Sequence, residues 1–167
     1  MRIIHPEARG SAARWLLQCA LATLTILVIF LLLDALLGAP FVALLGASTF
    51  IVFAMPKSRS AGPGSLLGGY LVGTFSGTLC SLLARSRLVG PAGVSQSKLL
   101  VTFGALSVGL AISIMVFTNT GHPPAAGLAL GFVLSPWNYA TIILVLSAAG
   151  LLSLARWLLR KELIDLA

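Results

Sequence analysis

The sequence predicts an all-α membrane protein, a helical bundle of four full transmembrane helices plus two short helical segments that are broken or re-entrant. Hydrophobic residues make up 58% of the 167 residues and charged residues only 9%, far less charge than the surface of a soluble globule needs. Four apolar runs reach the length that a bilayer core requires, and two others are shorter. The net charge of +7 comes from cations in the connections and at the ends, which is typical of a helix bundle anchored at headgroups.

The first predicted span covers residues 15–37 and follows a basic N-terminal segment, residues 1–14. Trp15 stands where an interfacial aromatic residue is expected. Asp34, near the end of the span, is the only acidic residue between Glu7 and Glu162. It either reaches headgroup water or takes part in proton or cation coupling.

The next apolar run, residues 41–55, is about 22 Å long as a helix, against a hydrocarbon core of about 30 Å. It ends at residues 56–64, which read PKSRSAGPG and hold two cations and two hydroxyls among helix-breaking residues. We interpret this region as the first broken segment.

Three further runs have full length: residues 66–84, 99–117 and 137–155. Two of them carry a face of small residues at every fourth position: Gly69, Gly73 and Gly77 in one, and Ala105, Gly109 and Ser113 in the other. Such faces let helices approach closely, either within the chain or between copies in a homo-oligomer.

The motif Gly121-His122-Pro123-Pro124 precedes a short apolar run, residues 125–134, and forms the second broken segment. Adjacent prolines cannot lie inside a helix, although a helix can begin at them. Broken backbone at membrane depth is tolerated only where protein buries it or water lines it. The motif therefore predicts a pocket or pathway within the bilayer.

A weak internal repeat relates the two broken segments. Three residues recur 64 positions later: Ala47, Val52 and Phe53 as Ala111, Val116 and Phe117. Each stretch then runs through polar residues to a proline that small residues follow. Repeats whose broken helices meet at one site are a common plan of transporters.

Charge counting predicts the orientation. If both short runs turn back without crossing, one side of the membrane holds three groups of cations. These are the cations of the N-terminal segment, those of residues 85–98, and those of the basic C-terminal segment, residues 156–167. Only Lys57 and Arg59 then lie on the other side, and the positive-inside rule places both termini in the cytoplasm of a bacterial inner membrane protein. If residues 41–55 cross fully, five crossings result and the charges predict no orientation.

The sequence resembles the HPP family of small integral membrane proteins, whose His-Pro-Pro tripeptide stands here at residues 122–124. The pieces that carry the resemblance are MVFTNTGHPPAAGLAL, GASTFIVFAMP and LLGGYLVG. It covers roughly residues 44–154, and it implies a single transmembrane domain, residues 15–155, with about four helices. For plastid and cyanobacterial relatives it implies nitrite transport. Gly62 departs from the family pattern, which commonly has Gln at that place.

The polar groups around the two breaks predict a transporter or channel for a small monovalent anion, with nitrite as the first candidate. A helix that begins at Pro63 or Pro123 offers an anion free N–H groups and the positive end of its dipole. If the breaks converge near the membrane centre, His122, whose ordinary pKa is about 6.5, could take up a proton with the anion. The candidate substrate-binding residues are Lys57, Ser58, Arg59, Ser60, Ser65, Thr118, Asn119, Thr120, His122 and Pro123.

Simpler interpretations stay open. Lys57 and Arg59 can reach headgroups, His122 can cap a turn, and residues 118–120 can cap the preceding helix. The alternative function is a non-transporting accessory or regulatory membrane subunit.

No enzyme is expected, because intramembrane hydrolases need paired aspartates, an activated serine with its base, or a metal motif. His122 could pair with Ser48 or Ser113, but nothing in the sequence brings them together. Cys19 and Cys80 lack metal-binding spacing. We therefore expect no metal, no cofactor and no nucleic-acid partner, and lipid and a small inorganic anion as partners.

Overall fold

The structure, a computed structural model, describes residues 12–33, 39–86, 95–136 and 138–166. These residues form α2 (Ala12–Leu32), α3 (Ala39–Ala54), the short 3-10 helix η1 (Arg59–Ala61), α4 (Pro63–Arg85), α5 (Gln96–Thr118), α6 (Pro123–Leu134) and α7 (Tyr139–Leu159). Four helices are long and apolar enough to cross a membrane, whereas α3 and α6 are shorter. The predicted fold class is confirmed.

The first predicted span is a helix from Ala12 to Leu32, and Asp34 lies outside the described residues. Prolines mark where the helices after the two breaks begin. Pro63 opens α4, and the pair Pro123-Pro124 opens α6, positions where the missing N–H is not needed and the fixed backbone angle suits a helix.

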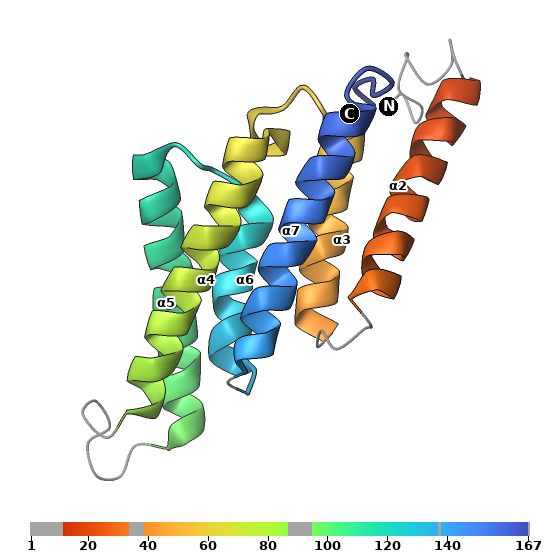
Figure 1. Cartoon of the computed structure of the whole chain (residues 1–167). Helices are drawn as coiled ribbons and strands as arrows, with labels where there is room; N and C mark the ends of the chain where they lie inside the picture. The colour runs from red at the N-terminus through yellow and green to blue at the C-terminus, as the bar shows by residue number, and fades with distance from the viewer. Residues whose placement is uncertain (1–11, 34–38, 87–94, 137, 167) are drawn as a thin grey trace, which may run out of the picture.

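The helices run alternately up and down the bundle (Figure 1). At one end, the Arg156 guanidinium donates a hydrogen bond of 2.9 Å to the Pro56 carbonyl, so the end of α7 lies beside the break after α3. At the other end, the Arg85 guanidinium donates to the carbonyls of Val133 and Ser135, at 3.0 and 2.9 Å. The end of α4 therefore holds the end of α6.

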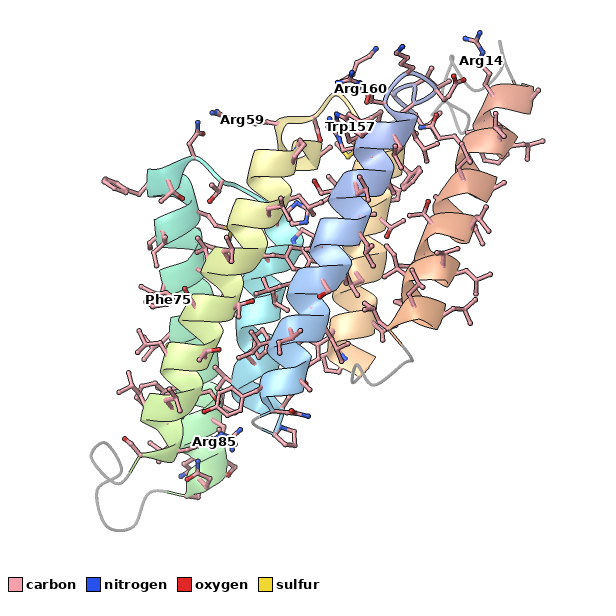
Figure 2. The ribbon with its side chains drawn as sticks, viewed as in Figure 1. Arg14, Arg59, Phe75, Arg85, Trp157 and Arg160 are labelled. Carbon is pink, nitrogen blue, oxygen red and sulfur yellow. The ribbon has the colours of Figure 1, made fainter. Side chains whose placement is uncertain are left out.

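The predicted grouping of charges is wrong, because α3 does not turn back. It runs antiparallel to α2, and the Gln18 amide near the start of α2 donates to the Phe53 carbonyl at the end of α3. Figure 2 shows Arg14 and Arg59 at one end of the bundle and Arg85 at the other. The cations described at the first end are Arg14, Lys57, Arg59, Arg156, Arg160 and Lys161.

The glycine face of α4 packs against α6. A Cβ atom at Gly69 would lie 2.7 Å from the His122 Cβ, and one at Gly73 would lie closer than 3.0 Å to the Ala125 carbonyl oxygen. Gly77 meets Ala129 in the same way. The expected close approach of helices thus occurs within the chain, and this face is not available to join two copies.

The second small-residue face remains on the surface. Ala105, Gly109 and Ser113 are all exposed, and nothing lies within 4 Å of a Cβ placed at Gly109. A homo-oligomer through this face stays a prediction.

Candidate functional site

His122 joins the two helix breaks. It stands immediately before α6 and is only 1% exposed. Its Nδ1 lies 2.9 Å from the Ser60 carbonyl oxygen in η1, and its Nε2 lies 2.9 Å from the Ser48 Oγ in α3. The two broken segments are therefore in contact, as the sequence led us to expect.

Tyr70 extends this contact into a chain of hydrogen bonds. Its hydroxyl lies 2.8 Å from the Ser48 Oγ, and its ring centroid lies 5.7 Å from that of His122. All three side chains are buried. Sequence reasoning missed Tyr70 and considered Ser48 only as a nucleophile. The available signal was a phenol and a hydroxyl inside apolar runs, where each needs a partner.

The Ser60 carbonyl fixes one hydrogen on the His122 ring. A carbonyl oxygen can only accept, so Nδ1 carries a hydrogen, and in the neutral ring Nε2 accepts from the Ser48 hydroxyl. The Ser48 oxygen then accepts from the Tyr70 hydroxyl. A second proton on His122 would make Nε2 donate to the Ser48 oxygen, and the Ser48 hydroxyl would then be free to donate elsewhere, for example to the Tyr70 oxygen. Protonation of the histidine would thus reverse the direction of its hydrogen bond to Ser48.

A cavity of about 450 Å³ borders His122. Its walls come from α5, from the start of α6 and from Ser60 of η1. Ile112, Met115 and Val116 make it largely apolar, and Val116 is 75% exposed, so the cavity lies near the outer face of the bundle.

The predicted cations do not line this cavity. Lys57 and Arg59 are exposed at the end of the bundle, where the Lys57 backbone N–H donates to Asp165 at 3.3 Å. His122 packs on Gly69, six residues into α4, or about 9 Å below the start of that helix. The site therefore lies nearer one end of the bundle than its centre.

The predicted hydroxyl residues mostly serve local structure. The Ser58 Oγ accepts from the Ala61 N–H at 3.3 Å and caps η1. Ser60 contributes its carbonyl to His122 and borders the cavity. Ser65 is buried in the first turn of α4, at 7% exposure.

Residues 118–120 cap α5. Asn119 adopts the left-handed conformation, with φ of 61°, and its N–H donates to the carbonyls of Met115 and Val116. The Thr118 hydroxyl donates to the Ile114 carbonyl at 2.8 Å, and its oxygen lies 2.8 Å from the Thr120 Oγ1. This geometry matches the capping interpretation of the stretch.

The two helix starts differ in the amides that they offer. Pro123 and Pro124 have no N–H, and the Ala125 N–H already donates to the His122 carbonyl at 2.9 Å. The expectation that α6 begins with free amides is therefore wrong at its first three positions. At α4, Pro63 and Gly64 are exposed at the end of the bundle.

The structure brings Ser48 and His122 within 2.9 Å, a pairing that the sequence did not reveal. Ser48 is fully buried, contacts Tyr70 and lies outside the cavity lining. Ser113 instead donates to the Gly109 carbonyl in its own helix. Among the described residues, no group of three or more His, Cys, Asp or Glu side chains could hold a metal ion.

Residues 7–163 match the family model described as HPP, transmembrane region. No curated protein and no solved structure matches the sequence. The matched range contains all the helices that the structure describes, the two breaks and the His-Pro-Pro tripeptide. The chain belongs to the HPP family of integral membrane proteins.

Proposed function

We propose that the chain transports a small monovalent anion, with nitrite as the first candidate, through the cavity beside His122. The proposal rests above all on the 2.9 Å contact between the His122 ring and the Ser60 carbonyl. This contact holds two helix breaks together at the wall of a cavity. Irregular backbone in the membrane is expected where it lines such a space.

The distribution of charge supports an anion as the solute. The described acidic residues, Glu162 and Asp165, follow α7, and the described helices contain none. Lys57 and Arg59 add to a basic end of the bundle, and a basic surface raises the local concentration of anions. These cations act at the mouth of the pathway and not at the cavity.

The apolar lining of the cavity favours an anion that travels with a proton. A bare anion loses hydration in such a space without gaining a cation as partner. A proton taken up at His122 offsets this cost, and the chain of hydrogen bonds to Ser48 and Tyr70 provides a second arrangement for the protonated state. The choice of nitrite rests on the resemblance to plastid and cyanobacterial relatives.

The test is nitrite uptake by liposomes that contain the purified protein, followed with a pH-sensitive dye inside the vesicles. Uptake should rise when the outside is acidic, and His122→Ala should lower the rate by about tenfold or more, since positioned proton transfer contributes at least that much. Ser113→Ala is the control, because Ser113 bonds only within α5. Equal rates for His122→Ala and the unaltered protein would refute the proposal.

One observation favours the alternative of an accessory subunit. Val116 and Phe117, at the end of α5 next to the cavity, are 75% and 92% exposed. A partner helix that covered this face would close the cavity from the side. In that case the chain alone would be inactive in liposomes, and activity would require a second membrane protein.

A further inference from the structure

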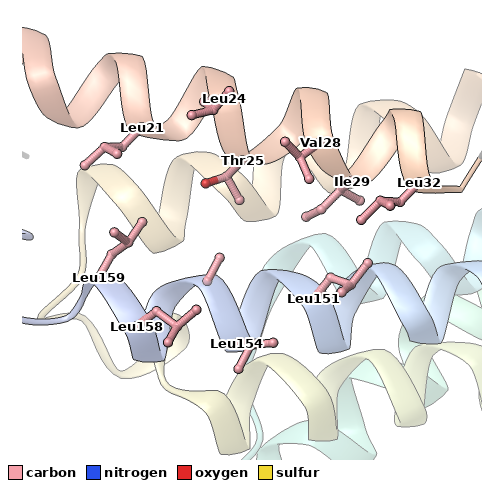
Figure 3. A pocket seen from close by; sticks show the side chains of 11 residues that line it. Leu21, Leu24, Thr25, Val28, Ile29, Leu32, Leu151, Leu154, Leu158 and Leu159 are labelled. Atoms are coloured by element: carbon pink, nitrogen blue, oxygen red, sulfur yellow. The ribbon is translucent and has the colours of Figure 1, made fainter.

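A long apolar groove runs along the junction of α2 and α7. Figure 3 shows side chains of the two helices facing each other across it. The groove has a volume of about 330 Å³ and is lined by 11 residues, of which only Thr25 is polar. Leucines make up half of the α2 wall, with Leu21, Leu24 and Leu32, and most of the α7 wall, with Leu151, Leu154, Leu158 and Leu159.

A small polar cavity of about 100 Å³ continues this groove at the basic end of the bundle. Arg14, Lys161 and Glu162 line it, so its charged lining has a net positive charge. Leu21 lines both the polar cavity and the apolar groove. The two spaces therefore adjoin at Leu21, with a charged space beside an apolar one.

Gln18 builds the charged space. It is 2% exposed, its amide donates to the Ile164 carbonyl at 2.7 Å, and its own oxygen accepts from the Ile164 N–H at 3.0 Å. These bonds hold the segment after α7 against α2 and place Lys161 in the same cavity as Arg14. Neither cation makes a hydrogen bond or ion pair within the described part of the chain.

We propose that the two spaces together bind one anionic phospholipid, with its phosphate between Arg14 and Lys161 and an acyl chain in the groove between α2 and α7. From Leu21 to Leu32 the groove follows α2 for about 16 Å, which matches one leaflet of a hydrocarbon core of about 30 Å. Basic pockets at the ends of transmembrane helices are suited to anionic lipid headgroups.

The dimensions favour a lipid over a helix of a second copy. Cα atoms of α2 and α7 approach within 8 Å of each other where the two helices touch, so a third helix, about 10 Å wide with its side chains, cannot insert between them. A single acyl chain is thinner and can follow the groove along their junction. The inference does not depend on the transported solute.

Selectivity should come from the headgroup, since two lipids with the same chains present the same apolar surface to the groove. Each cation near a membrane surface is expected to contribute about fivefold to the affinity for an anionic lipid. The unaltered protein should thus bind phosphatidylglycerol about 25-fold more tightly than phosphatidylcholine with the same chains.

The experiment measures binding of these two lipids to delipidated protein in detergent by native mass spectrometry. Arg14→Gln and Lys161→Gln should each weaken phosphatidylglycerol binding by about fivefold. Lys98→Gln, a matched change in the first turn of α5, should leave it unchanged. Leu154→Trp, which fills the groove, should weaken binding of both lipids.

Three results would overturn the proposal. The first is equal affinity for the two lipids in the unaltered protein. The second is competition by inorganic phosphate at the concentrations at which the lipid binds, which would show an anion site without an acyl chain. The third is a change of oligomeric state in Leu154→Trp on size-exclusion chromatography, which would make a second copy the occupant.

Discussion

The contact between α4 and α6 and the contact between α2 and α7 are built in opposite ways. In the first, Gly69, Gly73 and Gly77 bring backbone against backbone. In the second, leucines on both helices leave a groove of about 330 Å³. Lipid tails are as apolar as leucine, so large apolar side chains do not by themselves draw helices together in a membrane. Small residues thus pack α4 closely against α6 beside His122, whereas bulky residues leave space for a lipid along α2 and α7.

Gly73→Ala should cause the largest loss of stability, because it changes the tight contact between α4 and α6. The added Cβ would overlap the Ala125 carbonyl oxygen, so α4 and α6 would have to separate, at a cost of about 3 kcal/mol. Thermal unfolding in detergent should show a clearly lowered midpoint.

Gly109→Ala is the control for this change, because a Cβ there meets nothing within 4 Å. Its midpoint should be unchanged or slightly raised, since alanine favours a helix over glycine by up to about 1 kcal/mol. Equal losses for both variants would mean that the α4–α6 contact is no tighter than the lipid-facing surface.

An intermediate effect is expected for Ser48→Ala. The change leaves the His122 Nε2 and the Tyr70 hydroxyl without their buried partner, and orphaned polar groups should cost about 2 kcal/mol. Adding Tyr70→Phe should recover part of the loss, because it removes one of the two orphans. If the losses of stability from Ser48→Ala and Tyr70→Phe simply add in the double variant, the three side chains do not act as a unit.

The smallest effect is expected for Leu24→Ala in the groove between α2 and α7. Leu24 is 56% exposed, so its loss should change stability by no more than about 0.5 kcal/mol. The same unfolding measurement applies, with Ile29→Ala as the comparison, because Ile29 is 2% exposed in the same helix. Ile29 lies in the buried part of the same groove wall, so a larger loss for Leu24→Ala than for Ile29→Ala would show that the exposed part of the wall is packed as well.

Much of the fold could be predicted from the sequence, because length and breaker residues determine where apolar helices begin and end. The run 66–84 lies within α4 (Pro63–Arg85), and 99–117 lies within α5 (Gln96–Thr118). The direction of α3 could not be predicted from length. Its 16 residues are compatible with either turning back or crossing, and its contacts with Gln18 decide between them.

The site was predicted in part, around His122. An almost continuously apolar helix has no polar face to show which side points inward, so the sequence could not place Ser48 opposite His122. Charge alone suggested Lys57 and Arg59, but exposed cations at a helix end reach water more readily than a buried cavity. The prediction identified the break correctly. Of its candidate residues, Ser60 contacts the histidine, whereas Lys57 and Arg59 do not line the cavity.

The internal repeat holds for the arrangement of helices and not for its matching residues. Both α3–α4 and α5–α6 form a hairpin whose break lies at the same end (Figure 1). Val52 and Phe53 are nearly fully buried, whereas Val116 and Phe117 are 75% and 92% exposed. The repeated residues therefore occupy opposite environments, which three identities could not reveal.

The two attachments of α6 limit how the protein can move. At the start of α6, His122 forms hydrogen bonds to η1 and α3. At the end of α6, the Arg85 guanidinium donates hydrogen bonds to two carbonyls. With glycine contacts between these points, we expect α6 and α4 to move as one body. A gating motion would therefore have to occur at another helix. Among the described side chains of α2, only Gln18 and Ile29 are buried. An outward movement of α2 would therefore break the fewest packing contacts.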